Sequence, residues 1–172
     1  MESGRKTAIV INGAGGVGKD TLCDIASKYF KVYNVSSITP IKEIAAICGW
    51  RGEKDDRSRK FLSDLKLCTV GYNDYPTRWL SEKYRAFLES DDEIMFVHIR
   101  EAVEIEKFVS ATGGAAKTLL VRGGARMSRV SYGNVSDDLV ENYPYDYYFM
   151  NDKTLAEAER GFVELMKEIL AK

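Results

Sequence analysis

TAIVINGAGGVGKDT, residues 7–21, is the stretch of this sequence that decides the fold. Thr7–Asn12 is a short apolar run, typical of a central parallel strand that is buried on both faces. The next six residues, Gly13 to Gly18, include four glycines, and a helical pattern of apolar residues begins directly after them. A buried strand, a glycine-rich turn and a helix in this order predict a loop that binds phosphate.

The loop has the chemistry that a triphosphate requires. Glycines permit turns with positive φ that aim several backbone N–H groups at one point, and they leave room for close approach. The start of the helix adds a partial positive charge, and Lys19 adds a flexible cation for the outer phosphates. We therefore expect ATP to bind along the whole loop, at Gly13, Ala14, Gly15, Gly16, Val17, Gly18, Lys19, Asp20 and Thr21.

The same glycines also satisfy GxGxxG, the fingerprint of dinucleotide-binding folds, at Gly13, Gly15 and Gly18. That fingerprint needs an acidic residue about 20 positions further on to bind the ribose. No Asp or Glu occurs between Asp24 and Glu43, and a dinucleotide site has no need of a lysine directly after the last glycine. We prefer the phosphate loop over a dinucleotide site and over a purely structural glycine turn.

The position after the lysine commonly carries Ser or Thr as a ligand of Mg²⁺. Here it carries Asp20, and Thr21 follows. The sequence leaves open whether the metal is held by Thr21, by Asp20 or mainly through water.

Apolar patterns beyond the loop alternate between strands and helices. We expect further strands at Val32–Ser37, Glu93–Arg100, Ala116–Val121 and Asp146–Met150, and helices over most of 40–89, over Ala102–Ala111 and over Thr154–Lys172. This alternation predicts an α/β fold with a doubly wound parallel sheet of about five strands and helices on both faces. A length of 172 residues without a linker predicts one domain, 1–172.

Composition narrows the partners. The net charge is −1, and no basic stripe with interleaved aromatic residues predicts binding to nucleic acid. No apolar run approaches the ~20 residues that span a bilayer, and no signal-peptide pattern precedes the first strand, so we expect a soluble, cytoplasmic protein. The sequence does not indicate an oligomeric state. Three scattered cysteines predict buried free thiols rather than disulfides or a zinc site: Cys23, Cys48 and Cys68.

The GKDT ending of the loop resembles that of P-loop nucleoside monophosphate kinases, and other stretches are similar to the deoxynucleoside monophosphate kinase and adenylate kinase-like group. Residues 38–44 (ITPIKEI) with 54–59 (KDDRSR) resemble the acceptor-binding helical region of that group, here 38–90. His98-Ile99-Arg100 resembles its strand–arginine–helix element, and residues 145–155 its closing strand and helix. The resemblance implies a P-loop NTPase fold with ATP as donor, Mg²⁺, and a (deoxy)nucleoside monophosphate as acceptor.

Phosphoryl transfer between two anions requires cations from several directions, and arginine grips phosphate oxygens in pairs. We therefore predict catalytic roles for Lys19, Arg100 and Arg126. Arg122 is expected to contact ATP from a lid-like segment, 122–136, which resembles the lid of these kinases.

The acceptor is expected to contact Lys42, Arg57, Arg59, Trp79 and Arg100. Four of these five residues also have a simpler interpretation. The arginines at 57 and 59 fit a solvated helix face, Trp79 fits the core, and Arg100 fits a salt bridge with Glu101.

His98 stands where relatives carry an aspartate that organises Mg²⁺, and imidazole is a poor magnesium ligand. Either Asp20 has taken over part of that task, or metal handling is impaired, or His98 is a packed residue. Two other functions therefore stay open: a P-loop kinase of a small non-nucleotide metabolite, and a catalytically decayed ATP-binding sensor.

Overall fold

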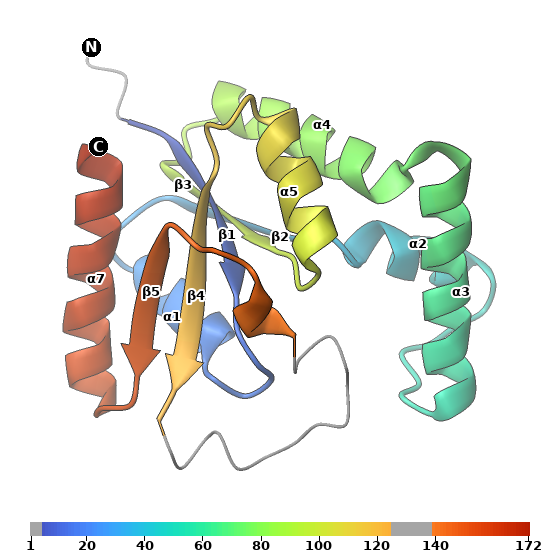
Figure 1. The fold of residues 1–172 in the computed structure, drawn as a ribbon, viewed down its shortest axis with the longest axis horizontal. Helices are drawn as coiled ribbons and strands as arrows, with labels where there is room; N and C mark the ends of the chain where they lie inside the picture. Colours follow the sequence, from blue (N-terminus) through green and yellow to red (C-terminus); the bar gives the residue numbers. More distant parts are fainter. Residues whose placement is uncertain (1–4, 125–138) are drawn as a thin grey trace.

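The computed structural model describes residues 5–124 and 139–172, and its centre is an all-parallel sheet (Figure 1). The sheet has five strands in the order β2-β3-β1-β4-β5. The strands are β1 (Thr7–Asn12), β2 (Val32–Ser36), β3 (Ile94–His98), β4 (Lys117–Gly123) and β5 (Tyr147–Asn151). The predicted α/β fold with a parallel sheet of about five strands is confirmed.

Helices cover both faces of the sheet. They are α1 (Lys19–Ala26), α2 (Thr39–Ile47), α3 (Asp56–Asn73), α4 (Tyr75–Glu89), α5 (Ala102–Ala111) and α7 (Leu155–Ala171), with a short 3₁₀ turn η1 at Val140–Asn142. Buried residues of α1 and α7 share one core cluster, and those of α4 and α5 share the other.

Strand β1 shows why its sequence is an unbroken apolar run. Ile9 and Ile11 belong to the core on the α1–α7 side, whereas Ala8 and Val10 belong to the core on the α4–α5 side. Successive side chains of a strand point to opposite faces, so a strand with helices on both sides needs apolar residues at every position.

The sheet has a switch point between β1 and β3, which are hydrogen-bonded neighbours. The chain leaves β1 through α1 on one face and leaves β3 through α5 on the other. The connections therefore diverge at the carboxyl ends of these strands, where parallel α/β sheets form their ligand crevice.

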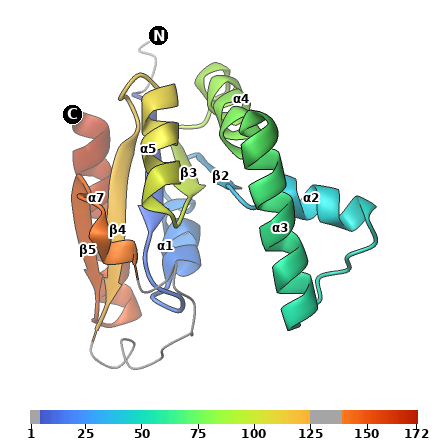
Figure 2. The same cartoon turned by 45° about the vertical axis from the view of Figure 1, so that its right-hand side comes forward.

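Helices α2 and α3 stand to one side of the sheet, next to α4 (Figure 2). None of the 18 residues of α3 is buried, so this helix contributes little to the hydrophobic core. Its first turn is capped by Asp55, whose side chain accepts a hydrogen bond of 2.7 Å from the Ser58 N–H. The predicted region 38–90 thus divides into two projecting helices and α4, which covers the sheet.

The expectation of three buried thiols is correct only for Cys23. Cys48 and Cys68 are exposed, because they lie at the end of α2 and on α3, outside the core. The lid-like segment 122–136, including Arg126, falls largely outside the described residues. Among the helices that are described, none has the length and apolar character to cross a membrane.

Candidate functional site

A cavity of about 790 Å³ opens at the carboxyl ends of β1, β2 and β3, at the switch point of the sheet. Three groups of residues line it. They are the loop residues Gly15, Gly16, Gly18, Lys19, Asp20 and Thr21, the strand-end residues Ile11, Asn12, Ser36, Ser37, Ile38, His98, Ile99 and Arg100, and the helix residues Lys42, Lys66, Glu101 and Glu104.

Two glycines of the loop could not be replaced without strain. A Cβ at Gly13 would lie 2.5 Å from the Val121 carbonyl oxygen, so only glycine lets the loop pass this close to β4. Gly18 has φ +90° at the N-cap of α1, where no side chain caps the helix. The first residues of α1, Lys19, Asp20 and Thr21, line the cavity at this helix start, which is where anions bind in proteins.

Lys19 lies over the loop that precedes it. Its Nζ donates hydrogen bonds to the carbonyl oxygens of Gly13 at 2.6 Å and Ala14 at 3.3 Å. Ala14 and Val17 pack into the core beneath, and Asn151 donates to the Val17 carbonyl at 2.8 Å. The loop thus has a supported underside and a cationic upper side that lines the cavity.

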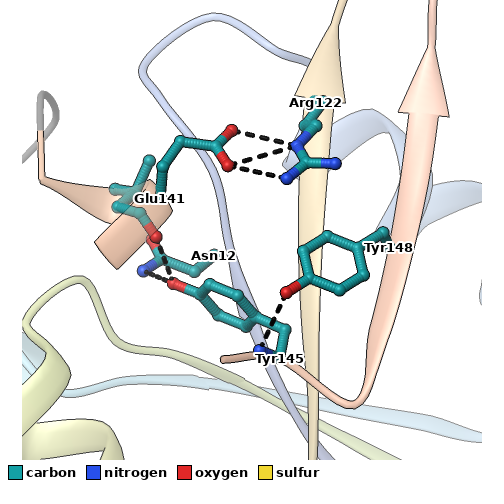
Figure 3. Close-up of polar contacts among 6 residues, drawn as sticks. Asn12, Arg122, Glu141, Tyr145 and Tyr148 are labelled. Carbon is teal, nitrogen blue, oxygen red and sulfur yellow. Dashed lines mark hydrogen bonds and ion pairs between the residues drawn. The ribbon is translucent and has the colours of Figure 1, made fainter. Parts of the chain in front are cut away.

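Asn12 connects the loop to two other parts of the site (Figure 3). Its amide nitrogen donates to the Arg100 carbonyl at 3.0 Å and to the Tyr145 hydroxyl at 2.8 Å, and its oxygen accepts from the Gly13 N–H at 2.9 Å. The Tyr145 hydroxyl in turn donates to the Val140 carbonyl, and burial raises its pKa to about 12. Sequence analysis did not assign Asn12 to the site, although a polar asparagine at the end of an apolar strand is a visible signal.

Arg100 and Arg122 were both predicted in the site, and the structure places them differently. Arg100 lines the cavity from the end of β3. Arg122 instead forms a two-pronged ion pair with Glu141, with Nε 3.0 Å from Oε1 and Nη2 2.8 Å from Oε2 (Figure 3). Its guanidinium also lies 4.6 Å from the centre of the Tyr148 ring. In this conformation Arg122 does not line the cavity, and its contact with ATP stays a prediction.

The residues predicted to hold Mg²⁺, Asp20 and Thr21, both line the cavity beside Lys19. Their oxygens are the ligands that Mg²⁺ prefers, and one or two such groups together with substrate phosphates are its usual environment. Among the residues that the structure describes, no group of three His, Cys, Asp or Glu side chains could hold a metal by itself. The donor set therefore fits a magnesium ion that arrives with the nucleotide.

His98 also lines the cavity, and its ring contacts Asn34 and Cys23. Its Nε2 lies 3.3 Å from Oδ1 of Asn34 and 3.9 Å from the Cys23 sulfur. Burial lowers the pKa of His98, which keeps the ring neutral at physiological pH, and burial raises the pKa of Cys23 to about 12, which keeps its thiol protonated. These contacts fit a packed, neutral imidazole.

Of the predicted acceptor residues, Lys42 and Arg100 line the cavity. Arg57 and Arg59 lie in the exposed first turn of α3, where Arg59 pairs with Asp56 at 3.7 Å. Trp79 packs against the α4–α5 core beneath the Lys83 ammonium. The structure does not bring these last three residues to the cavity, and their contact with an acceptor stays a prediction.

Three charged residues that sequence analysis missed meet across the cavity. The Nζ of Lys66 on α3 lies 2.9 Å from one carboxylate oxygen of Glu101 and 2.9 Å from one of Glu104, both at the start of α5. The side chains of Lys66 and Glu104 are only 20% and 13% exposed. Glu101 and Glu104 follow a strand end, which is a usable signal, but nothing local in the sequence indicates Lys66.

The chain resembles known proteins in structure but not detectably in sequence. No protein-family model and no curated protein sequence matches the chain.

Several solved structures resemble the chain over nearly their whole length, and three of them are kinases by name. A protein assigned as a kinase from Chloroflexus aurantiacus has a TM-score of 0.55 and 14% identity, with 97% of each chain covered. A sugar kinase from Janibacter has a TM-score of 0.52 and 12% identity, with 96% of this chain and 95% of that one covered. A gluconokinase from Sinorhizobium meliloti has a TM-score of 0.54 and 14% identity, with 98% and 95% covered. At these identities the likeness shows a shared fold and no more.

Proposed function

We propose that the protein is an ATP-dependent phosphotransferase that moves the γ-phosphoryl group of ATP to a small acceptor bound in the same cavity. The observation that carries this proposal is the meeting of the glycine loop and Lys19 with Arg100 and Lys42 around one cavity. Cations on both sides of a transferring phosphoryl group are what this chemistry requires.

The donor half of the cavity is the loop from Gly13 to Thr21. Its amides and the Lys19 ammonium bind the outer phosphates, and Asp20 and Thr21 supply oxygens to the magnesium that accompanies them. A magnesium ion held there would neutralise part of the phosphate charge. Asn12 holds the start of the loop through its hydrogen bond with the Gly13 N–H.

The acceptor lies opposite the loop, toward α2, α3 and α5. An oxygen of the acceptor forms a bond to the γ-phosphorus while the bond from that phosphorus to the β-bridging oxygen breaks, which releases ADP. Where the acceptor oxygen is a hydroxyl, its proton is released as well. Arg100 neutralises charge that develops on the transferred group, because it lines the cavity beside the end of β3.

Two acceptor classes are supported by different observations. A (deoxy)nucleoside monophosphate is supported by the resemblance of residues 38–44 and 98–100 to that kinase group. A small non-nucleotide metabolite is supported by the hydroxyl, amide and charged side chains of the described lining, which includes no Phe, Tyr or Trp, and by the sugar kinase and gluconokinase among the similar structures.

The experiment is a coupled assay of ADP release from Mg-ATP over eight ribo- and deoxyribonucleoside monophosphates and a set of hydroxylated metabolites, each tested with Lys19→Ala. We expect at least one acceptor to stimulate ADP release, and Lys19→Ala to lower kcat/KM about 100-fold or more. Lys28→Ala is the matched control. Lys28 follows the end of α1, pairs with Glu159 on α7 and does not line the cavity.

Binding of Mg-ATP without stimulated turnover by any acceptor would instead support a nucleotide sensor. Unchanged ATP affinity in Lys19→Ala would overturn the proposal itself, because the loop would then not be the phosphate site.

A further inference from the structure

We propose that the acceptor is a small polyhydroxylated molecule and that Glu101 and Glu104 recognise its hydroxyl groups. This inference rests on the proposed function, because the acceptor must lie within reach of the ATP bound by the loop. It concerns the acceptor half of the cavity, defined here as the part lined by Lys42, Lys66, Arg100, Glu101 and Glu104.

The geometry of the charged triad leaves oxygens for a ligand. Lys66 contacts Oε1 of Glu101 and Oε1 of Glu104, each at 2.9 Å. A carboxylate has two oxygens and about four lone-pair directions, so one contact to an ammonium leaves most of its capacity to accept hydrogen bonds. All three side chains line the cavity.

The Glu101 carboxylate reaches across the cavity. Glu101 is the N-cap residue of α5, but its side chain makes no capping hydrogen bond to the first amides of the helix. The carboxylate instead accepts a hydrogen bond of 2.9 Å from Lys66 on α3. The carboxylate therefore belongs to the cavity wall rather than to its own helix.

The chemistry of the triad matches hydroxyl groups better than a phosphate. A hydroxyl both donates and accepts, a carboxylate only accepts, and an ammonium only donates. Neighbouring hydroxyls can therefore donate to Glu101 and Glu104 and accept from Lys66. A phosphate monoester dianion has little to donate, so it could pair with Lys42, Lys66 or Arg100 but not with the two carboxylates.

The rest of the lining agrees with this assignment. Ser36 and Ser37 add hydroxyls at the end of β2, and Ile38 and Ile99 add apolar surface for carbon-bound hydrogens. Burial raises the pKa of Glu104 in spite of the nearby ammonium, so keeping this carboxylate in the wall has a cost, as is frequent at functional sites. The described lining includes no Phe, Tyr or Trp, and its one ring, that of His98, lies against Asn34 and Cys23.

The test measures binding by calorimetry, with the cavity's donor half filled by Mg²⁺ and the non-hydrolysable analogue AMP-PNP. The probes are D-glucose, D-sorbitol and D-gluconate, against the same eight nucleoside monophosphates. The variants are Glu101→Gln and Glu104→Gln, which keep size and remove the charge. Glu106→Gln is the matched control, because Glu106 is exposed on the same helix and does not line the cavity.

We expect at least one polyhydroxylated probe to bind, with an affinity lowered at least tenfold in Glu104→Gln and in Glu101→Gln and unchanged in Glu106→Gln. The affinity for Mg-AMP-PNP should stay within about twofold in all three variants. Binding of a nucleoside monophosphate that is indifferent to Glu104→Gln would overturn the inference, and so would AMP-PNP binding without binding of any polyhydroxylated probe. Both results would be compatible with the proposed phosphotransfer. If the unmodified protein did not bind AMP-PNP at all, the proposed function would be contradicted as well.

Discussion

The side-chain amide of Asn12 donates a hydrogen bond of 2.8 Å to the hydroxyl of Tyr145, and both residues are buried. They are far apart in the sequence, one at the end of β1 and the other just before β5. Asn12 also accepts from the Gly13 N–H and donates to the Arg100 carbonyl, so one amide group joins the glycine loop to the end of β3.

Replacing Tyr145 with Phe should loosen this junction. The change removes one acceptor from Asn12 and the donor to the Val140 carbonyl, and leaving buried polar groups unpaired costs about 1–3 kcal/mol. We expect a lower Tm and a several-fold lower kcat with stimulating acceptor, because Arg100 is held less firmly. Tyr143→Phe is the control: its ring contacts that of Tyr145 at 5.1 Å, but it takes no part in the hydrogen bonds at Asn12. Equal effects of the two substitutions would argue against the junction.

Replacing Glu141 with Gln should release Arg122. The pair is partly exposed, so it is worth about 0–1 kcal/mol, and breaking it makes the guanidinium available for phosphate at little cost. If Arg122 contacts ATP, the affinity for Mg-AMP-PNP should rise by up to about fivefold. Calorimetry measures this, with Glu168→Gln as the control because Glu168 forms a comparable exposed pair with Lys172. Unchanged or weaker binding in Glu141→Gln would count against a role for Arg122 in ATP binding.

Replacing Gly13 with Ala should damage the loop without any change of charge. The added Cβ would lie 2.5 Å from a backbone oxygen of β4 and 2.9 Å from the Val17 side chain. Because a backbone atom cannot easily move, we expect a loss of stability of about 1–3 kcal/mol together with loss of AMP-PNP binding. Gly71→Ala on α3 is the control, since nothing lies within 4 Å of a Cβ there. Thermal unfolding and calorimetry measure both effects, and full AMP-PNP affinity in Gly13→Ala would contradict the prediction.

His98 should make the protein less stable in mild acid. Burial lowers its pKa below the ordinary 6.5, with a smaller opposing effect of Asp20 and a smaller supporting effect of Lys19. Between the folded-state pKa and 6.5 the unfolded chain binds more protons, so the free energy of unfolding falls as pH falls through this window. Above that window the contribution is fully present.

Comparing Tm at pH 7.5 and at pH 5.5 for the wild type and His98→Asn isolates this residue, because the carboxylates are common to both proteins. We expect a smaller decrease of Tm on acidification in His98→Asn. An identical decrease in the two proteins would show that the ring titrates normally.

Much of the fold follows from local signals. The apolar run of β1 gave its bounds, Thr7–Asn12, without error, and α5 was predicted at Ala102–Ala111, as found. The helical stretch expected over most of 40–89 contains α2, α3 and α4. These features depend on neighbouring residues, whose backbone preferences and hydrophobic spacing are written directly in the chain.

The site was predicted only where it is local. The loop from Gly13 to Thr21 is a continuous stretch, so its chemistry could be recognised before any tertiary arrangement was known. Arg100 could be placed because strand ends of parallel sheets meet at one edge. The partner of Arg122 could not be predicted, because Glu141 belongs to a turn that lies beside Arg122 only in the folded chain.

The sequence by itself thus determined a glycine-rich loop between a buried strand and a helix, because glycine spacing, strand hydrophobicity and helical spacing act over a few residues. Only the tertiary structure decided what faces that loop. Lys66 meets Glu101 and Glu104 because α3 packs beside α4 and opposite α5. Asn12 meets Tyr145 because β4 pairs with both β1 and β5. Contacts between distant segments depend on strand order and helix packing, and no short pattern in the chain encodes them.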